Sequence, residues 1–292
     1  MGVSEPTGPD RRTALALLGV AGLAGLAALG ADTVVPSEGR AAAWRRPAPR
    51  ARAAVNPAGP TAPAAPPSPT PPPPPPPPEP RMAAWSPRAP LTSTAHPVRY
   101  LHELTPPPPP KSIALTIDDG PSPLWTPRVL DLLDEHGVKA TFFIIGEQVE
   151  EFPKLTRRIA DAGHQVCNHT MTHPDLSNAS ARKVKHEIVE AHDKIAQVTG
   201  VVPSFFRAPG GGWSHRVYDC IAEHKMVPID WSVDPRDWSL PGVGHIRRTM
   251  LSAKADDILL CHDGGGDRSQ TFASLKTVIP ALKKRGLAFV AL

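Results

Sequence analysis

From Lys111 to the C-terminus, short apolar runs alternate with amphipathic helical stretches, and this alternation restricts the fold. The runs have the length and composition of buried strands, at residues 113–117, 140–144, 165–167, 204–206, 226–229, 258–260 and 287–290. Helical patterns lie between them, at residues 125–136, 148–162, 181–199, 214–224, 244–253 and 271–284. Alternating strands and helices are typical of parallel strands with crossover connections. We therefore predict an α/β fold, a distorted (β/α) barrel of about seven parallel strands.

The expected location of function follows from this fold. No glycine fingerprint for phosphate follows the first strand, which disfavours a nucleotide-binding fold. In a (β/α) barrel the functional residues lie at the carboxyl ends of the strands. The residues that directly follow each expected strand are therefore the candidates.

The first 110 residues have a different composition. They contain 28 of the 39 prolines, including unbroken runs at residues 71–78 and 106–110. Such sequence favours polyproline II and cannot bury a core. We expect a disordered Pro/Ala-rich linker at residues 32–110 and the folded catalytic domain at residues 111–292.

Residues 1–31 are interpreted as a signal sequence. Arg11 and Arg12 precede the apolar run 14–29, a pattern that resembles a twin-arginine signal. A membrane anchor through residues 14–30 is the alternative, but the run is short for a spanning helix. Either reading predicts a bacterial protein that is exported, extracellular or associated with the cell wall or membrane.

Charge and cysteine usage exclude some classes of function. Residues 111–292 carry 22 basic and 22 acidic side chains, so the net charge of +4 resides in the N-terminal segment and indicates no nucleic-acid partner. The domain contains Cys167, Cys220 and Cys261, with no regular spacing. This pattern favours free buried thiols over a disulfide framework or a cysteine-based zinc site.

Two adjacent aspartates follow the first expected strand. Asp118 and Asp119 come after the run 113–117, and Gly120-Pro121 turns the chain. Neighbouring side chains of a strand point to opposite faces, but a turn at this point would let both carboxylates reach one site. Taken alone, the pair fits a solvated turn equally well.

Two histidines follow the third expected strand. His169 and His173 are four residues apart, and Pro174 indicates that they lie in a loop rather than a helix. Two histidines and a carboxylate are typical of a catalytic zinc site that leaves one position for water. Asp119 would supply the carboxylate.

Polar residues also follow later strands. Arg207 and the glycines after it suit a carboxylate partner and an oxyanion hole, although an exposed Gly-rich loop is the simpler reading. Residues 230–238 are dense in acids and tryptophan, which suits sugar binding or an ordinary salt-bridged loop. His262, tuned by a nearby aspartate, is a natural general acid.

Taken in order, these stretches resemble the polysaccharide deacetylase family, which is carbohydrate esterase family 4 or the NodB-homology domain. The resemblance spans residues 112–292. Its motifs are Asp118-Asp119, His169-Thr-Met-Thr-His173, Arg207-Ala-Pro-Gly-Gly211, Asp234-Pro-Arg-Asp-Trp238 and Leu260-Cys-His262. Ile117 stands where phenylalanine is more usual, and Gly210 stands where many members have an aromatic residue.

The resemblance implies a metal site and a base. Asp119, His169 and His173 would bind a divalent metal, zinc in the first place and cobalt as the alternative. Asp118 would be the general base toward the attacking water, and Arg207 would hold it.

The resemblance also implies the groups that act on the substrate. The backbone N–H of Gly210 would stabilise charge on the acetyl oxygen. His262, oriented by Asp237, would protonate the leaving amine. Leu260 and Trp238 would line the acetyl pocket.

We therefore expect a secreted or surface-tethered, monomeric, metal-dependent N-deacetylase that releases acetate. Its substrate would be an N-acetylglucosamine polysaccharide, either peptidoglycan or chitin-like. Deacetylation of acetyl xylan by the same site, and a non-catalytic wall-binding module, are the alternatives. A zinc protease is disfavoured because no His-Glu-x-x-His motif occurs in the sequence.

Overall fold

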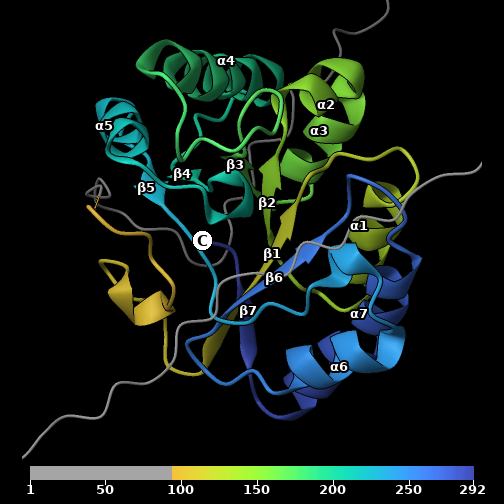
Figure 1. Ribbon diagram of the computed structural model, residues 1–292. Helices are drawn as coiled ribbons and strands as arrows, with labels where there is room; N and C mark the ends of the chain where they lie inside the picture. Colours follow the sequence, from red (N-terminus) through yellow and green to blue (C-terminus); the bar gives the residue numbers. More distant parts are fainter. Residues whose placement is uncertain (1–93) are drawn as a thin grey trace, which may run out of the picture. The chain divides into compact units, whose positions relative to one another are not determined.

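The structure is a computed structural model that describes residues 94–292 (Figure 1). The expected signal or anchor at residues 1–31 lies outside the described residues, as does the linker up to residue 93. None of the helices between residues 94 and 292 combines the length and the apolar character needed to cross a membrane.

Seven strands form one curled parallel sheet, which confirms the predicted distorted (β/α) barrel. The strands are β1 (Ser112–Asp118), β2 (Thr141–Ile144), β3 (Gln165–Asn168), β4 (Phe205–Phe206), β5 (Val227–Pro228), β6 (Ile258–His262) and β7 (Ala288–Val290). Their order is β5-β4-β3-β2-β1-β6, and β7 pairs with β1. In this register Asp118 of β1 lies beside Phe143 of β2 and His262 of β6. Two predicted site residues are therefore neighbours at one edge of the sheet.

Helices cover the outside of the sheet (Figure 1). They are α1 (Thr126–Glu135), α2 (Gly146–Glu151), α3 (Pro153–Asp161), α4 (Ala181–Thr199), α5 (His215–Glu223), α6 (Val243–Leu251) and α7 (Ser269–Lys284). Short 3₁₀ turns are η1 (Leu101–Glu103), η2 (Pro209–Gly211) and η3 (Asp237–Ser239). The prediction of a single helix at residues 148–162 is wrong. This stretch forms two helices, because Phe152 has a non-helical backbone and Pro153 begins α3.

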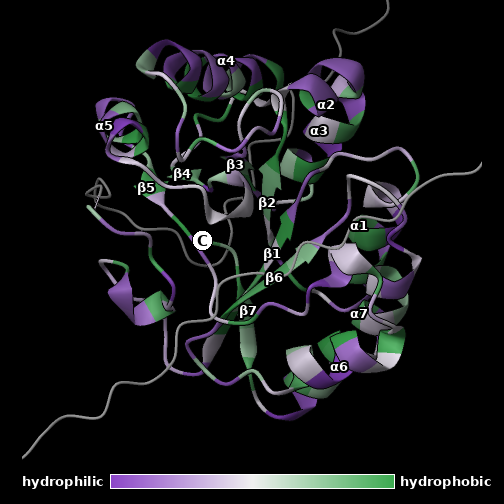
Figure 2. Ribbon diagram, in the orientation of Figure 1, coloured by the Kyte–Doolittle hydropathy of each residue, from purple (hydrophilic) through white to green (hydrophobic). Residues whose placement is uncertain are grey.

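The two faces of the sheet build two cores. Ile113, Leu115 and Ile117 of β1 pack with the helices, in a cluster that includes Leu133 and Ile279. The intervening residues of the strands face inward, where apolar side chains fill the barrel: Ala114, Phe143, Cys167, Phe205 and Ile258. Figure 2 shows this division as hydrophobic strands surrounded by helices with hydrophilic outer faces. Thr116 and Asp118 belong to the inward set of β1 by the same alternation.

The segment from Val98 to Leu104 closes the gap between the two ends of the sheet. Val98 forms a bridge with Ile229 after β5, and Tyr100 forms one with Asp257 before β6. The side chains of Val98, Leu101 and Leu104 are buried in the inner core. The folded unit thus begins before Lys111, the boundary predicted from the sequence. The prediction placed residues 98–104 in the linker because these apolar residues lie among prolines.

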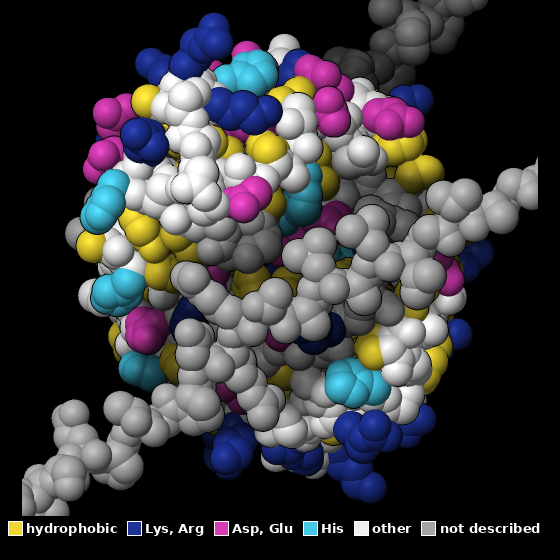
Figure 3. Space-filling view, in the orientation of Figure 1, with side chains coloured by type: hydrophobic (Ala, Val, Ile, Leu, Met, Phe, Trp, Pro, Cys, Tyr) yellow, Lys and Arg dark blue, Asp and Glu magenta, His cyan; other side chains and the backbone are white. Residues whose placement is uncertain are grey.

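Cys167, Cys220 and Cys261 are free and buried, as the sequence predicted. Figure 3 shows Lys and Arg side chains gathered along the lower edge of one face of the molecule and mixed with acidic side chains along its upper part.

Candidate active site

The backbone of Asp119 brings two neighbouring carboxylates into one site. Asp118 is the last residue of β1 and is buried on its inner face. Asp119 has a φ of 72°, in the left-handed region, so the alternation of the strand stops there. Both residues line the same cavity. The turn that the sequence suggested therefore brings both carboxylates into one cavity.

The loop that carries the two histidines is held by a buried glutamate. Glu187 of α4 is fully buried, and its carboxylate accepts the N–H groups of Met171 (3.1 Å) and Thr172 (2.8 Å). It also accepts the Thr172 hydroxyl (2.8 Å). The role of Glu187 was not predicted from the sequence. The available signal was its position on the apolar face of α4, three residues after Val184.

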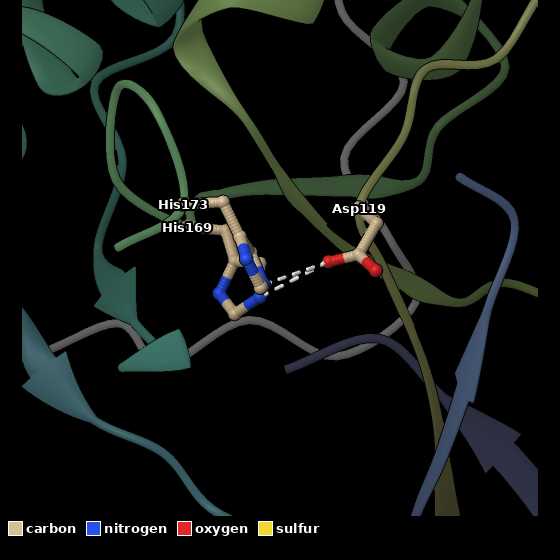
Figure 4. A group of neighbouring side chains, drawn as sticks. All are labelled: Asp119, His169 and His173. Carbon is tan, nitrogen blue, oxygen red and sulfur yellow. Dashed lines mark ion pairs between the residues drawn. The ribbon is translucent and has the colours of Figure 1, made fainter. Parts of the chain in front are cut away.

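Three side chains converge as a possible metal site (Figure 4). The ligand atoms of Asp119, His169 and His173 all lie within 4.8 Å of one another. Asp119 Oδ1 is 3.4 Å from His169 Nε2 and 3.2 Å from His173 Nε2. The figure shows both imidazoles pointing toward this carboxylate.

The chemistry of these donors fits a divalent metal. His169 Nδ1 donates to the carbonyl of Arg207 (2.8 Å), so Nδ1 carries a proton and Nε2 is the ring nitrogen that faces Asp119. Asp119 Oδ1 is buried and accepts no hydrogen bond from residues 94–292. Burial opposes ionisation of Asp119, but its contacts with the two histidines outweigh it and hold its pKa well below the usual range. Two imidazole nitrogens and an ionised carboxylate form a typical zinc donor set.

Arg207 holds the other aspartate. Its guanidinium is fully buried, and Nη1 donates to Asp118 Oδ1 (2.7 Å) and to the Thr116 hydroxyl (2.8 Å). Nη2 donates to the carbonyl of Asp230 (2.9 Å), and the group lies 4.1 Å from the centre of the Phe143 ring. One oxygen of Asp118 is thus fixed, and the other lies 3.7 Å from His169 Nε2.

A second buried pair lies on the next strand. His262 Nδ1 is 2.7 Å from Asp237 Oδ1, and Asp237 Oδ2 accepts the backbone N–H of His262 (2.9 Å) and the Thr271 hydroxyl (2.7 Å). Burial lowers the pKa of His262, but the contact with Asp237 outweighs it and the pKa is raised to about 9. The imidazole is therefore protonated at neutral pH.

Asp263, the residue after His262, does not hold the imidazole. Its carboxylate accepts the Thr126 hydroxyl (2.6 Å), and burial raises its pKa to about 7.

All the predicted site residues meet at one cavity of about 420 Å³. Eight of them line it: Asp118, Asp119, His169, His173, Gly210, Trp238, Leu260 and His262. Arg207 and Asp237 support two of these, Asp118 and His262. Leu260 is buried, whereas Trp238 is 48% exposed.

Further lining residues were not assigned from the sequence. Trp231 and Asp234 belong to the stretch that was read as suited to sugar binding. Arg268 follows the glycine run 264–266, and that run was the available signal for a close approach of the backbone to the site.

Comparison with known proteins identifies the family of this chain. A sequence model described as polysaccharide deacetylase matches residues 105–229. A peptidoglycan-N-acetylglucosamine deacetylase of Bacillus cereus is 44% identical over 183 residues, which span 62% of this chain and 85% of the relative. The chain belongs to the polysaccharide deacetylase family.

Two other relatives agree with this assignment. A chitooligosaccharide deacetylase of Sinorhizobium fredii is 44% identical over 187 residues, covering 60% of this polysaccharide deacetylase and 87% of the relative. The crystal structure of a peptidoglycan N-acetylglucosamine deacetylase superposes with a TM-score of 0.61 and 34% identity, covering 62% of this chain and 86% of that one. The prediction of an enzyme, a polysaccharide deacetylase, is thus confirmed.

The role of Glu187 yields a prediction for the histidine loop of this deacetylase. In Glu187→Gln the amide oxygen can still accept both backbone N–H groups, which share Oε2, but the negative charge and the oxygen that accepts the Thr172 hydroxyl are lost. We expect the affinity for Zn²⁺, measured by isothermal titration calorimetry, to fall about 10-fold. Glu190→Gln is the matched control, because Glu190 lies on the exposed face of α4. Equal affinities in the two variants would show that Glu187 does not organise the loop.

The His262–Asp237 pair yields a prediction about pH. Asp237→Asn removes the charge that favours the protonated imidazole, so the pKa of His262 should fall from about 9 by about 1–3 units. The stabilisation from this pair should be complete between the unfolded pKa values of aspartate, about 3.9, and histidine, about 6.5. It should be lost as the pH rises through about 9 and as the pH falls through the lowered pKa of Asp237. NMR titration of the imidazole measures the shift. Asp234→Asn, in the same loop, should leave the pKa unchanged, and an unaltered pKa in Asp237→Asn would refute the assignment.

Proposed function

We propose that this polysaccharide deacetylase is a metal-dependent N-deacetylase of an N-acetylglucosamine polysaccharide, peptidoglycan or chitin-like. It would release acetate and leave a free amino sugar. The observation that carries the proposal is that a carboxylate held by an arginine and an imidazole held by an aspartate flank one metal donor set. The printed activities of the relatives, on peptidoglycan N-acetylglucosamine and on chitooligosaccharide, support the substrate class.

Asp119, His169 and His173 would hold the metal. Their mixed nitrogen and oxygen donors suit Zn²⁺, and Co²⁺ accepts the same set. When bound, the cation supplies Lewis acidity to the acetyl carbonyl and to the attacking water.

Asp118 is proposed as the general base. Arg207 fixes Asp118 Oδ1, so Oδ2 remains available to take a proton from the attacking water. The fixed guanidinium also prevents the carboxylate from turning away from the cavity. Because Asp118 and Asp119 come from one turn, the base and the metal donor keep a constant separation.

His262 is proposed as the general acid. The nitrogen of an amide leaves as a strongly basic anion unless it is protonated, so N-deacetylation requires a proton donor. The pKa of His262, raised to about 9 by Asp237, keeps that donor charged at neutral pH. An ester oxygen leaves more readily than an amide nitrogen. The presence of a protonated His262 as proton donor therefore favours N-deacetylation over O-deacetylation of acetyl xylan.

Three residues are proposed to contact the acetyl group. Gly210 has a φ of 59°, which glycine adopts without strain, and its backbone N–H would donate to the oxygen on which charge develops. Leu260 and Trp238 line the same cavity and would receive the methyl group. The presence of the base, the acid and the metal donors disfavours a non-catalytic wall-binding module.

We also propose that the enzyme acts outside the cytoplasmic membrane as a secreted or tethered monomer. Residues 1–31 would direct export or anchor the chain, and the Pro/Ala-rich linker would carry the catalytic domain into the cell wall.

The proposal is tested by acetate release from chitooligosaccharide, peptidoglycan and acetylated xylan. We expect release from one or both of the N-acetylated substrates, loss of release with a chelator, and recovery with Zn²⁺ or Co²⁺. Mass spectrometry of the product would locate the free amine. Release from acetylated xylan alone would establish the ester alternative, and no release by the metal-loaded protein from any of the three would support the non-catalytic one.

A further inference from the structure

Arg268 is a buried cation in the wall of the cavity. It lies in the loop between β6 and α7, and it is only 5% exposed. Nε donates to the carbonyl of Gly264 (2.7 Å) and Nη1 to that of Asp267 (3.3 Å). These two bonds fix the plane of the guanidinium. Nη2 donates no hydrogen bond to any group of residues 94–292.

The free nitrogen packs close to Gly265. A Cβ at Gly265 would lie only 2.9 Å from Asp119 Oδ2 and 3.2 Å from Arg268 Nη2, so no side chain fits there, and the φ of 71° also favours glycine. Gly265 and Arg268 both line the cavity that holds the metal donors. The glycine thus lets the guanidinium approach the wall of this cavity near Asp119.

The topology places Arg268 on the same side of the cavity as His262. Gly210, the proposed oxyanion donor, follows β4, which lies three strands away from β1. His262 is the last residue of β6, the neighbour of β1 on the other side, and Arg268 lies in the loop that follows β6. A group that contacts Arg268 would therefore lie on the side of the proposed general acid rather than beside Gly210.

No carboxylate of residues 94–292 lies within ion-pair distance of Arg268, although Asp119 Oδ2 is near it across Gly265. Asp118 is paired with Arg207, and Asp237 is paired with His262. Asp119 pairs with the two histidines that share the metal site. Among residues 94–292, Arg268 forms no ion pair. A buried guanidinium gains most from a carboxylate partner, through charge-assisted hydrogen bonds.

We propose that Arg268 is a specificity-determining residue that binds a carboxylate of the substrate, close to the sugar nitrogen that His262 protonates. This inference rests on the proposed function and narrows its substrate class. The favoured substrate is a glycan that carries carboxylates next to its acetamido groups, as in peptidoglycan strands with lactyl ethers on alternate sugars. Neutral chitooligosaccharide would bind without this contact.

The test compares peptide-free peptidoglycan strands with neutral chitooligosaccharide. Arg268→Gln should raise KM for the anionic strands about 10–100-fold, the cost of a hydrogen bond to a charged group. Its loss on chitooligosaccharide should be at least about 10-fold smaller. Arg268→Lys should recover part of the loss, because the charge returns without the planar fork. Lys276→Gln, which removes an exposed cation from α7, is the charge control.

Three results would overturn the inference. An equal rise of KM on the two substrates in Arg268→Gln would mean that Arg268 does not bind a carboxylate of the substrate. Weaker Zn²⁺ affinity in Arg268→Gln, measured by calorimetry, would mean that it supports Asp119 instead. Wild-type release from chitooligosaccharide alone would exclude an anionic preference. Absence of release from both substrates by the wild-type enzyme would be a failure of the proposed function itself, whereas the other outcomes leave that function intact.

Discussion

The buried ion pair between Arg207 and Asp118 is the interaction on which the site depends. Arg207 follows β4, and its side chain reaches Thr116 and Asp118 at the end of β1. The same residue contacts the carbonyl of Asp230 beyond β5, and its own carbonyl fixes the tautomer of His169 after β3. A desolvated guanidinium is costly unless every donor is satisfied, and removal of one partner of such a pair typically costs about 3–5 kcal/mol. One side chain thus sets the positions of the base and of a metal donor together.

Two buried charge pairs support the two proton transfers, one through a carboxylate held by an arginine and the other through an imidazole held by an aspartate. Arg207 holds the carboxylate of Asp118 by an ion pair, whereas Asp237 favours the protonated form of His262. In each pair the supporting charge is fully buried, while the supported group lines the cavity. A site with one fixed acceptor and one fixed donor on neighbouring strands can accept a proton from water and deliver one to an amine in the same turnover.

The sequence predicted the local features of this protein well and the distant ones poorly. The strands and most helices follow from apolar periodicity, and the site motifs follow directly after strands, where a barrel gathers them. Pro153 indicated a break between two helices, but the apolar periodicity on both sides of it led to the prediction of one helix. The burial of Val98 and Leu101 depends on a gap between strands that are far apart in the chain. Glu187 was missed for the same reason, because its partners Met171 and Thr172 come from another segment.

The central claim is that Asp118 and Asp119, adjacent in one turn, have different tasks. Asp118→Asn and Asp119→Asn test it most directly when Zn²⁺ affinity and acetate release are measured on the same preparations. The account predicts that Asp118→Asn binds Zn²⁺ as the parent does and loses turnover by about 10²–10⁴-fold, whereas Asp119→Asn loses Zn²⁺ affinity. Equal loss of Zn²⁺ in both variants, or turnover retained by Asp118→Asn, would contradict it.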